Sequence, residues 1–239
     1  MKYDRPLQTG NLLKRYKRFL SDIRLDDGTE ITAHCANTGS MKNCQPENGR
    51  VWVFDSQNPK RKLPMSWEWV EIEGQYKACI NTSRANALVK EALLNHVVQE
   101  LPEITEEQLK SEPKVDEGRL DFLIQQNDDE IYIEVKNVTL LEDDGIGYFP
   151  DAVTTRGAKH LEVLKRLKSE GKRAILLFCV AHEGINQVKP AAHIDSKYTE
   201  ALKQAVEQGV EVLAYQATFV TDEQASELFL ETAIPVILD

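Results

Sequence analysis

Two short segments in the middle of the chain carry the acidic and basic side chains best placed to do chemistry together. Residues 131–136 read Ile-Tyr-Ile-Glu-Val-Lys, and the period of two of an extended strand puts Glu134 and Lys136 on the face opposite the aliphatic residues. Residues 119–124 read Arg-Leu-Asp-Phe-Leu-Ile, where the same period puts Asp121 opposite the apolar side chains. A polar loop joins the two segments and favours a hairpin. If both apolar faces enter one core, Asp121, Glu134 and Lys136 meet on the other face.

A further carboxylate is expected from a helix that precedes this hairpin. Residues 85–98 are rich in helix formers, and Glu91 lies within their apolar stripe. Carboxylates held together raise one another's pKa unless a divalent cation neutralises them. Oxygen-only ligands suit Mg²⁺ or Mn²⁺, so the sequence predicts such an ion bound by Asp121, Glu134 and Glu91.

These groups suit phosphodiester hydrolysis. A bound metal ion lowers the pKa of a water molecule and polarises the phosphodiester, while Lys136 would orient the nucleophile or stabilise the developing negative charge. Asp121, Glu134 and Lys136 are therefore the predicted catalytic residues. An Asp followed by Glu-x-Lys on the adjacent strand, with a Glu in the preceding helix, resembles the PD-(D/E)xK nuclease superfamily. The alternative is structural: Asp121 and Lys136 would form a cross-strand ion pair, and Glu134 would be a solvated acid on an edge strand.

The distribution of charge limits where a nucleic acid can bind. The chain of 239 residues has 29 Lys and Arg against 39 Asp and Glu, a formal net charge of −10, but residues 1–80 have a net charge of +3 and the remainder −13. Phosphate contacts need local positive charge, so the first third is the predicted binding part. Cations beside aromatic rings are suited to binding single-stranded nucleic acid, and the N-terminus of a helix is suited to binding a phosphate group. The predicted nucleic-acid-binding residues are Lys14, Arg15, Tyr16, Lys17, Arg18, Lys60, Arg61, Lys62 and Trp67, with Arg156, Lys159 and His160 at the start of a later helix.

Turn signals divide the first third into short strands, whereas helices and strands alternate beyond residue 82. The predicted strands of the first part are 16–25, 30–35, 50–54 and 67–73, and about five short strands suit a small β-barrel of the oligonucleotide/oligosaccharide-binding (OB) type. The predicted elements of the second part are helix 85–98 capped by Thr82 or Ser83, the hairpin, helix 153–170, strand 174–181, helix 196–208 and strand 210–218. This order is α/β, with helices on the faces of a sheet, and the whole chain is α+β. We therefore expect an OB-type domain at residues 1–81 and a nuclease-like α/β domain at residues 82–239.

Some of these residues have plainer interpretations. Trp67 is equally suited to the barrel core, and Asp151 or Thr154 is suited to cap the helix that carries Arg156. Four scattered cysteines without a CxxC pair indicate reduced thiols. No segment is apolar enough for a signal peptide or a membrane span, so we expect a cytoplasmic protein with no membrane partner. The sequence makes no prediction of the oligomeric state.

Blocks along nearly the whole chain resemble the sugar fermentation stimulation protein A family. These blocks are residues 15–22, 34–39, 60–62, 81–82 with Asn86, 119–122, 133–136, 138–140, 147–153, 156–157 and 160–161. The resemblance implies an OB barrel joined to a nuclease-like domain, DNA binding without sequence specificity, and a role in the regulation of sugar (maltose) utilisation. It also implies a nuclease pattern on Asp121, Glu134 and Lys136, with Glu91 as a fourth member. Ala36, at a position where the family block leads us to expect proline, is the one departure.

Three functions are consistent with these observations. The first is a DNA-binding protein with a Mg²⁺-dependent nuclease site. The second is a non-enzymatic DNA-binding transcriptional regulator in which the nuclease site is vestigial. The third is a carbohydrate-binding barrel, since aromatic-lined barrels also take oligosaccharides.

Overall fold

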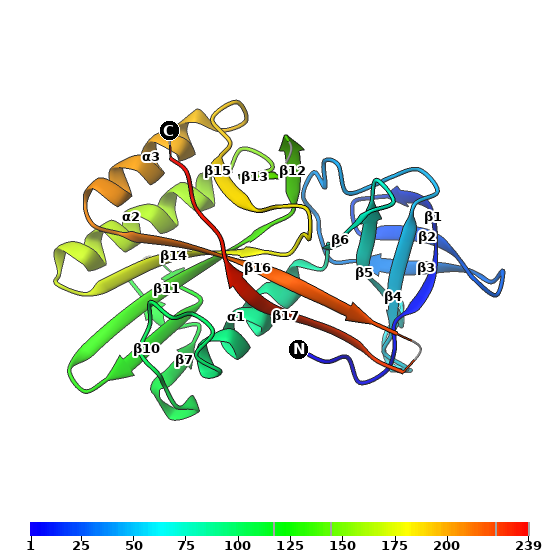
Figure 1. The fold of residues 1–239 in the computed structure, drawn as a ribbon, viewed down its shortest axis with the longest axis horizontal. Coiled ribbons are helices and arrows are strands. Elements are labelled where there is room, and N and C mark those ends of the chain that lie inside the picture. The colour runs from blue at the N-terminus through cyan, green and yellow to red at the C-terminus, as the bar shows by residue number, and fades with distance from the viewer. Residues whose placement is uncertain (117, 144, 223, 239) are drawn as a thin grey trace.

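The N-terminal part of the chain forms a closed β-barrel (Figure 1). The computed structural model describes residues 1–116, 118–143, 145–222 and 224–238. The barrel strands are β1 (Gln8–Tyr16), β2 (Leu20–Leu25), β3 (Glu30–Cys35), β4 (Arg50–Asp55), β5 (Met65–Ile72) and β6 (Tyr76–Cys79). They pair in the order β3-β2-β1-β4-β5-β6, and a parallel pairing of β3 with β5 closes β1 to β5 into a barrel. The predicted OB-type barrel is confirmed.

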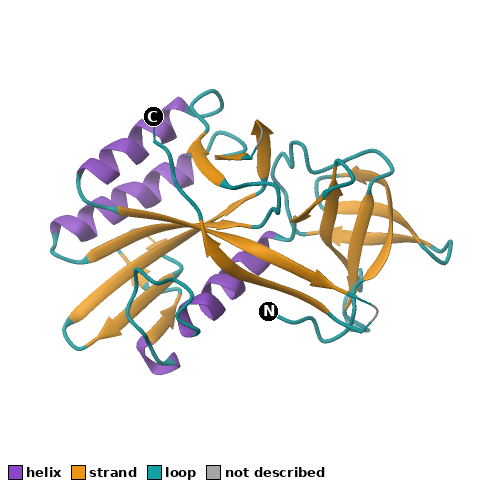
Figure 2. Cartoon of the chain, in the orientation of Figure 1, coloured by secondary structure: helices purple, strands orange, loops and turns teal. Residues whose placement is uncertain are grey.

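The rest of the chain forms a mixed α/β domain around a six-stranded sheet, as predicted. The sheet strands are β7 (Leu109–Ser111), β10 (Phe122–Gln126), β11 (Asp129–Val138), β14 (Arg173–Val180), β16 (Glu211–Thr221) and β17 (Ser226–Ala233). Their order is β17-β16-β14-β11-β10-β7, with β11, β14 and β16 parallel and the others antiparallel to their neighbours. Figure 2 shows α1 (Ala85–Leu94) on one face of this sheet and α2 (Thr155–Ser169) with α3 (Ser196–Glu207) on the other.

Shorter elements connect these parts. Two 3-10 helices are present: η1 (Thr82–Arg84) precedes α1, and η2 (Glu106–Gln108) precedes β7. The short strand β8 (Lys114–Val115) pairs with β9 (Gly118–Arg119). A small sheet consists of β12 (Leu140–Asp143), β13 (Ile146–Phe149) and β15 (Gln187–Pro190). Because β12 follows β11 almost directly, this small sheet lies just beyond the end of the strand that carries Glu134 and Lys136.

Each face of the large sheet has its own apolar core. Ile131, Ile133 and Val135 of β11 belong to the cluster that contains the buried residues of α1. The buried residues of α2 and α3 form a second cluster on the opposite face. Glu134 and Lys136 alternate with the aliphatic residues and contact α2. The predicted alternation of β11 between an apolar face and a face with Glu134 and Lys136 is therefore observed.

The two domains are joined by one continuous apolar core. Trp69 of β5 packs edge to face on Phe219 of β16, with ring centroids 5.1 Å apart. Tyr3 and Trp52 belong to the same cluster, which extends to α1 and the large sheet. The backbone N–H of Tyr3 donates to Ser226 O of β17 at 3.0 Å, and Figure 1 shows β16 and β17 reaching across to the barrel. The barrel and the α/β domain consequently pack as neighbours with buried contacts.

A buried ionic cluster lies at this domain junction. Glu68 of β5 is fully buried, and its carboxylate accepts hydrogen bonds from Arg84 Nε and Nη2, both at 2.9 Å. Asn81 Nδ2 donates to the same carboxylate at 2.9 Å and the Tyr3 hydroxyl at 3.0 Å. A buried carboxylate is tolerated only when it is paired and hydrogen-bonded. The cluster thus connects the barrel wall to the start of α1.

The first strand differs from the sequence prediction. Residues 16–25 are not one strand, because Lys17 and Arg18 have φ values of 48° and 65° and form the turn between β1 and β2. Together with Phe19 they form a three-residue turn between the paired Tyr16 and Leu20. The expectation that residues 16–25 alternate regularly between two faces is therefore wrong.

The elements near the predicted site also differ in detail. Helix α1 ends at Leu94 instead of residue 98, and Asn81, whose side chain accepts from Ser83 N, caps the 3-10 turn before it. Strand β10 begins only at Phe122, so the alternation does not extend back to Leu120. Leu120 packs in the α2 cluster, whereas Phe122 packs in the α1 cluster.

The four cysteines are buried free thiols. Burial raises the pKa of Cys44 and of Cys179 to about 12, so both are protonated and unreactive at neutral pH. Within the described part of the chain, no helix is long and apolar enough to cross a membrane.

Candidate active site

The three residues predicted to be catalytic lie close together where the start of β10 meets β11. Asp121 directly precedes β10, which pairs with β11, and Asp121 Oδ2 accepts a hydrogen bond from Val135 N at 2.7 Å. Val135 lies between Glu134 and Lys136 on β11. This backbone contact holds the Asp121 carboxylate against the strand segment that carries the other two side chains.

Glu134 is the centre of the cluster. It is 2% exposed, and its Oε1 accepts hydrogen bonds from Lys136 Nζ and from His160 Nδ1. Its Oε2 is buried and has no hydrogen-bond partner among the described residues. Burial alone would raise the pKa of Glu134, but the hydrogen bond from His160 and the charge of Lys136 hold this pKa below its ordinary value. The Glu134 carboxylate is therefore ionised at neutral pH.

Asp121 has the opposite pKa shift. Burial and the negative charge of Glu134 raise the pKa of Asp121, against the hydrogen bonds from Val135 N and Asn86. Asn86 Nδ2 donates to Asp121 Oδ1 at 2.7 Å from the first turn of α1. Two neighbouring carboxyls with pKa values moved apart are typical of functional sites.

Helix α2 forms the third side of the cluster. Thr154 caps the helix, as one of the two predicted alternatives proposed, and its Oγ1 accepts from Gly157 N at 3.0 Å. Arg156 Nε donates to His160 Nε2 at 3.4 Å, which leaves the Nδ1 side of the ring for Glu134. Lys159 is exposed and has no side-chain partner in the described structure. Three residues of α2 were predicted to contact phosphate. One of them, His160, contacts Glu134 and so belongs to the carboxylate cluster.

The donor set fits a divalent cation held by Asp121 and Glu134. Buried polar atoms are almost always hydrogen-bonded, so the unpartnered Oε2 of Glu134 needs a ligand. Burial first, and then the negative charge of Glu134, raise the pKa of Asp121, and a cation bound to both carboxylates would offset each cause. Within the described residues, no group of three or more His, Cys, Asp or Glu side chains is arranged around a common metal position. Two carboxylates with several waters are the kind of shell that Mg²⁺ accepts.

Glu91 does not join this cluster, and its prediction as a metal ligand is corrected. Its carboxylate is 40% exposed and pairs with the Met1 ammonium group. Five residues separate Glu91 from Asn86, which at about 100° per residue places the two side chains about 140° apart around α1. Since Asn86 faces Asp121, Glu91 points away from it. Helix α1 thus contributes the Asn86 carboxamide to the site, whereas the sequence predicted the Glu91 carboxylate.

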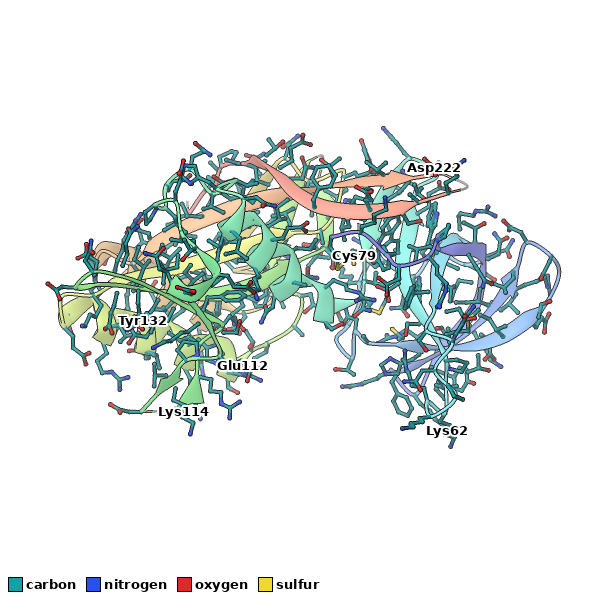
Figure 3. The ribbon with its side chains drawn as sticks, turned by 90° about the horizontal axis from the view of Figure 1, so that it is seen from below. Lys62, Cys79, Glu112, Lys114, Tyr132 and Asp222 are labelled. Carbon is teal, nitrogen blue, oxygen red and sulfur yellow. The ribbon has the colours of Figure 1, made fainter. Side chains whose placement is uncertain are left out.

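The barrel residues predicted to bind nucleic acid separate into two groups. Lys17, Arg18, Lys60 and Lys62 are exposed, and their side chains have no partner among the described residues. Figure 3 shows Lys62 at the outer edge of the barrel, pointing into solvent. These four cations are free to meet phosphates.

The other barrel cations are occupied by contacts within the barrel. Lys14 Nζ lies 3.3 Å from Asp22 Oδ2, and the Tyr16 hydroxyl donates to Asp22 Oδ1 at 3.2 Å. Arg15 Nη2 donates to the carbonyl oxygens of Asn37 and Gly39 at 2.9 and 3.1 Å. Arg61 Nη2 donates to Ser66 Oγ at 3.1 Å. Arg15 in particular holds the loop that follows β3.

The prediction that Trp67 contacts nucleic acid is wrong. Trp67 is fully buried in the barrel core, and its Nε1 donates to Trp69 O at 2.8 Å. Trp52 and Trp69 are also buried, and their rings pack at the domain junction. A stacking platform on this barrel therefore cannot come from tryptophan.

A cleft between the barrel and the small sheet is not lined by the carboxylate cluster. It has a volume of about 720 Å³ and lies between a barrel loop and the small sheet. Glu73, Glu142 and Asp143 line it, and its one cationic side chain, Lys42, is paired with Glu142. This charge does not suit an anionic ligand such as DNA.

Comparisons with known protein families cover both domains. Residues 13–80 match the family model described as the SfsA N-terminal OB domain, and residues 83–223 match the sugar fermentation stimulation protein RE domain. A sugar fermentation stimulation protein homolog from Marinomonas sp. (strain MWYL1) is 53% identical over 241 residues, covering 100% of this chain and 93% of its own length. Another, from Shewanella frigidimarina (strain NCIMB 400), is 53% identical over 219 residues, covering 90% of this chain and 92% of its own.

A solved structure has the same fold over its whole length. It is described as Pyrococcus furiosus SfsA in complex with Ca²⁺, and it matches with a TM-score of 0.84 at 26% identity. The match covers 99% of this chain and 98% of the other. The arrangement of an OB barrel before a restriction-endonuclease-like domain is therefore shared with that protein.

Proposed function

The chain belongs to the sugar fermentation stimulation protein (SfsA) family, and we propose that it binds DNA and hydrolyses phosphodiester bonds with a divalent metal ion at Asp121 and Glu134. The observation that carries the proposal is the unpartnered, buried Oε2 of Glu134 beside the Asp121 carboxylate. A protein with this fold was solved in complex with Ca²⁺, which supports the binding of a divalent cation by a protein of this fold. Mg²⁺ or Mn²⁺ is the proposed cofactor, and the cytoplasm the proposed location.

The residues of the cluster have separate proposed roles. When bound, the cation supplies an activated water and polarises the phosphodiester. The Lys136 ammonium group lies at the same carboxylate and is placed to orient the nucleophile or to stabilise the negative charge that develops on the phosphate. His160 positions Glu134 and keeps it ionised. Asn86 and Val135 N orient Asp121 from two sides.

DNA is proposed to contact both domains. The free cations Lys17, Arg18, Lys60 and Lys62 supply phosphate contacts on the barrel, and Lys159 supplies one next to the carboxylate cluster. Figure 3 shows Lys62 of the barrel and Lys114 of the β8–β9 hairpin projecting on the same side of the molecule. Phosphate contacts carry no sequence information, so binding without sequence specificity is the expected behaviour.

One observation favours a second function, a DNA-binding transcriptional regulator without catalysis. Glu134 Oε1 already accepts from both Lys136 and His160, so much of its charge is balanced without a metal ion. The relatives carry a name that refers to stimulation of sugar fermentation. A regulatory role in sugar utilisation would fit this second function.

A cleavage assay separates the two functions. The full chain is incubated with single-stranded, duplex and branched DNA in Mg²⁺, Mn²⁺ or EDTA, beside Asp121→Asn and Lys136→Met. Asp129→Asn and Lys110→Met are matched controls, because both side chains are exposed and have no partner in the described structure. We expect metal-dependent cleavage that falls at least about 100-fold in the two site variants and is unchanged in the controls.

Two results would contradict the nuclease proposal. Binding without cleavage on any of the substrates would favour the regulator. Cleavage that persists in both site variants would mean that the reactive groups lie elsewhere or come from a contaminant.

A further inference from the structure

A small pocket between the two domains adjoins the carboxylate cluster. Its volume is about 230 Å³, below the range of drug-sized ligand sites. The barrel contributes Asn37, and the α/β domain contributes Thr82, Asn137, Thr139 and Asp151. Neither the metal ligands nor the free surface cations line it, so its chemistry is distinct from that of the catalytic cluster.

We propose that this pocket receives one unpaired base of a nucleic-acid strand whose backbone lies at Asp121 and Glu134. The inference rests on the proposed function, and it assigns to that site a substrate class. The ligand is a nucleobase outside a double helix, either in a single strand or extruded from a duplex.

The chemistry of the lining fits a base and does not fit a phosphate. No cationic side chain lines the pocket within the described structure, and Asp151 would repel an anion. Carboxamides such as Asn37 and Asn137 offer both a donor and an acceptor, which match the edge of a base. A carboxylate accepts from the exocyclic amino group of a base. Asp151 Oδ2 accepts from Ser40 Oγ at 3.0 Å, while no side-chain donor of the described residues reaches its Oδ1.

Asn37 offers a second, independent observation. It is 7% exposed, and its Oδ1 accepts from Gly39 N at 2.8 Å, which fixes the orientation of the carboxamide. Its Nδ2 has no partner among the described residues. This Nδ2 is accessible from the pocket and not enclosed by protein, so it is a donor that a ligand in the pocket can reach. The side chains of Asn137 and Thr139 are likewise without partners in the described structure.

The pocket is close to the catalytic cluster along two separate chain segments. Asn137 directly follows Lys136 on β11. Thr82 begins the 3-10 helix η1, which leads directly into α1, and Asn86 in the first turn of α1 donates to Asp121. Residues of the pocket are thus chain neighbours of the carboxylate cluster both on β11 and at the start of α1, which suits a strand that extends from one site to the other.

The barrel loop that supplies Asn37 is held in place. Arg15 donates to the Asn37 carbonyl oxygen from within the barrel. Ser40 Oγ donates to Asp151 O at 3.1 Å, and Asn43 Nδ2 donates to Leu141 O at 2.8 Å across the domain junction. A pocket built on such contacts is preformed, which lowers the entropic cost of holding a base. This gives the turn-forming segment around Asn37 a role beyond connecting two strands.

Binding of DNA with and without one base tests the proposal in EDTA, where no cleavage occurs. The probes are a short fluorescent single-stranded oligonucleotide and a series in which one nucleotide at a time is abasic. The variants are Asn137→Ala and Asn37→Asp, the second of which keeps the Oδ1 that accepts from Gly39 but removes the free donor. Asn95→Ala is the matched control, since Asn95 is exposed at the far end of α1.

We expect one abasic position to weaken native binding by about 5- to 10-fold, as expected for one stacked or hydrogen-bonded base. The two pocket variants should show the same loss with the intact strand and no further loss with that abasic strand. Equal affinity of the native protein for every abasic strand would overturn the proposal, even if the protein binds and cleaves DNA. Equal weakening of intact and abasic strands by the variants would also overturn it.

A second measurement separates failure of the pocket from failure of the proposed function. Ligand-observed NMR with the four free deoxynucleosides reports on the pocket without any phosphate contact. A signal that disappears in Asn137→Ala and persists in Asn95→Ala supports the pocket, even in the absence of cleavage. The absence of a signal, together with no abasic effect, removes the pocket and leaves the nuclease proposal standing.

Discussion

Replacing Arg84 with Met is expected to destabilise the whole molecule, because it leaves the Glu68 carboxylate buried without its cation. Glu68 is fully buried, whereas Arg84 is 27% exposed and supplies two of the four donors to that carboxylate. Breaking a buried ion pair from one side costs about 3–5 kcal/mol. Asn81 and Tyr3 still donate in the variant, and Arg84 is partly solvated, so we expect the low end, about 3 kcal/mol. For a chain of this length that loss corresponds to a fall in Tm of about 6–12 °C.

Urea and thermal unfolding measure this loss, with Arg24→Met as the control. Arg24 pairs with Glu30, but the two side chains are 54% and 60% exposed, so that pair contributes under about 1 kcal/mol. Because the apolar core continues through the junction, barrel and α/β domain should unfold in one transition. The double variant Glu68→Gln/Arg84→Met should recover part of the loss, since it removes the unpaired charge. If Arg84→Met costs no more than Arg24→Met, or shifts only one of two separate transitions, this view of the junction is refuted.

Four further predictions concern the site and the DNA surface. In EDTA at pH 7, Asp121→Asn should raise the Tm. The folded protein raises the pKa of Asp121, so ionisation of this carboxyl destabilises the native protein as the pH rises. The gain in Tm of the variant should therefore shrink as the pH falls towards 3.8. Glu134→Gln should lower the Tm at pH 7. The folded protein lowers the pKa of Glu134, so the ionised carboxylate stabilises the fold above pH 4.5, and this stabilisation is lost as the pH falls below 4.5. Thermal melts across pH should show changes in Tm of opposite sign for the two variants. Mg²⁺ at 100 times its Kd should stabilise the native protein by about 2.7 kcal/mol and leave Asp121→Asn unchanged, as measured by calorimetry; equal stabilisation of both would place the ion elsewhere. Lys60→Ala and Lys62→Ala should each reduce the salt slope of DNA binding by about 1 in fluorescence anisotropy, while Lys197→Ala on α3 leaves it unchanged; a constant slope would remove these lysines from the interface.

Local chemistry explains why much of the fold was predictable. Helix α2 begins after a threonine cap and is followed by Gly171, with a φ of 82°, and both signals are written in neighbouring residues. Strand β14 is a continuous apolar run because both of its faces are covered. By contrast, the turn at Lys17 and Arg18 lacks the glycine or asparagine that usually marks left-handed residues. The pairing of β17 with the N-terminal segment joins the two ends of the chain, and no local pattern encodes it.

The same distinction applies to the candidate site. The alternation along β11 is local, so the sequence was sufficient to predict that Glu134 and Lys136 share a face. The position of Glu91 depends on how α1 is rotated about its axis against the sheet. An apolar stripe does not determine which polar side chain of the helix then faces Asp121. The contact of His160 with Glu134 joins two elements 26 residues apart, and it was invisible until α2 could be placed on the sheet.

The packing of the barrel on the α/β domain limits how this protein can handle a strand of DNA. Trp52 and Trp69, which on an isolated OB barrel could stack on bases, are buried at the junction instead. The barrel is therefore left with exposed cations and with the polar loop that carries Asn37. Hydrogen bonds across the junction hold that loop against the α/β domain. The barrel cannot reposition itself without also breaking the apolar core of the junction. A strand that binds the barrel cations should consequently meet the carboxylates in one fixed orientation, and selection of its structure should depend on whether a base can leave the stack.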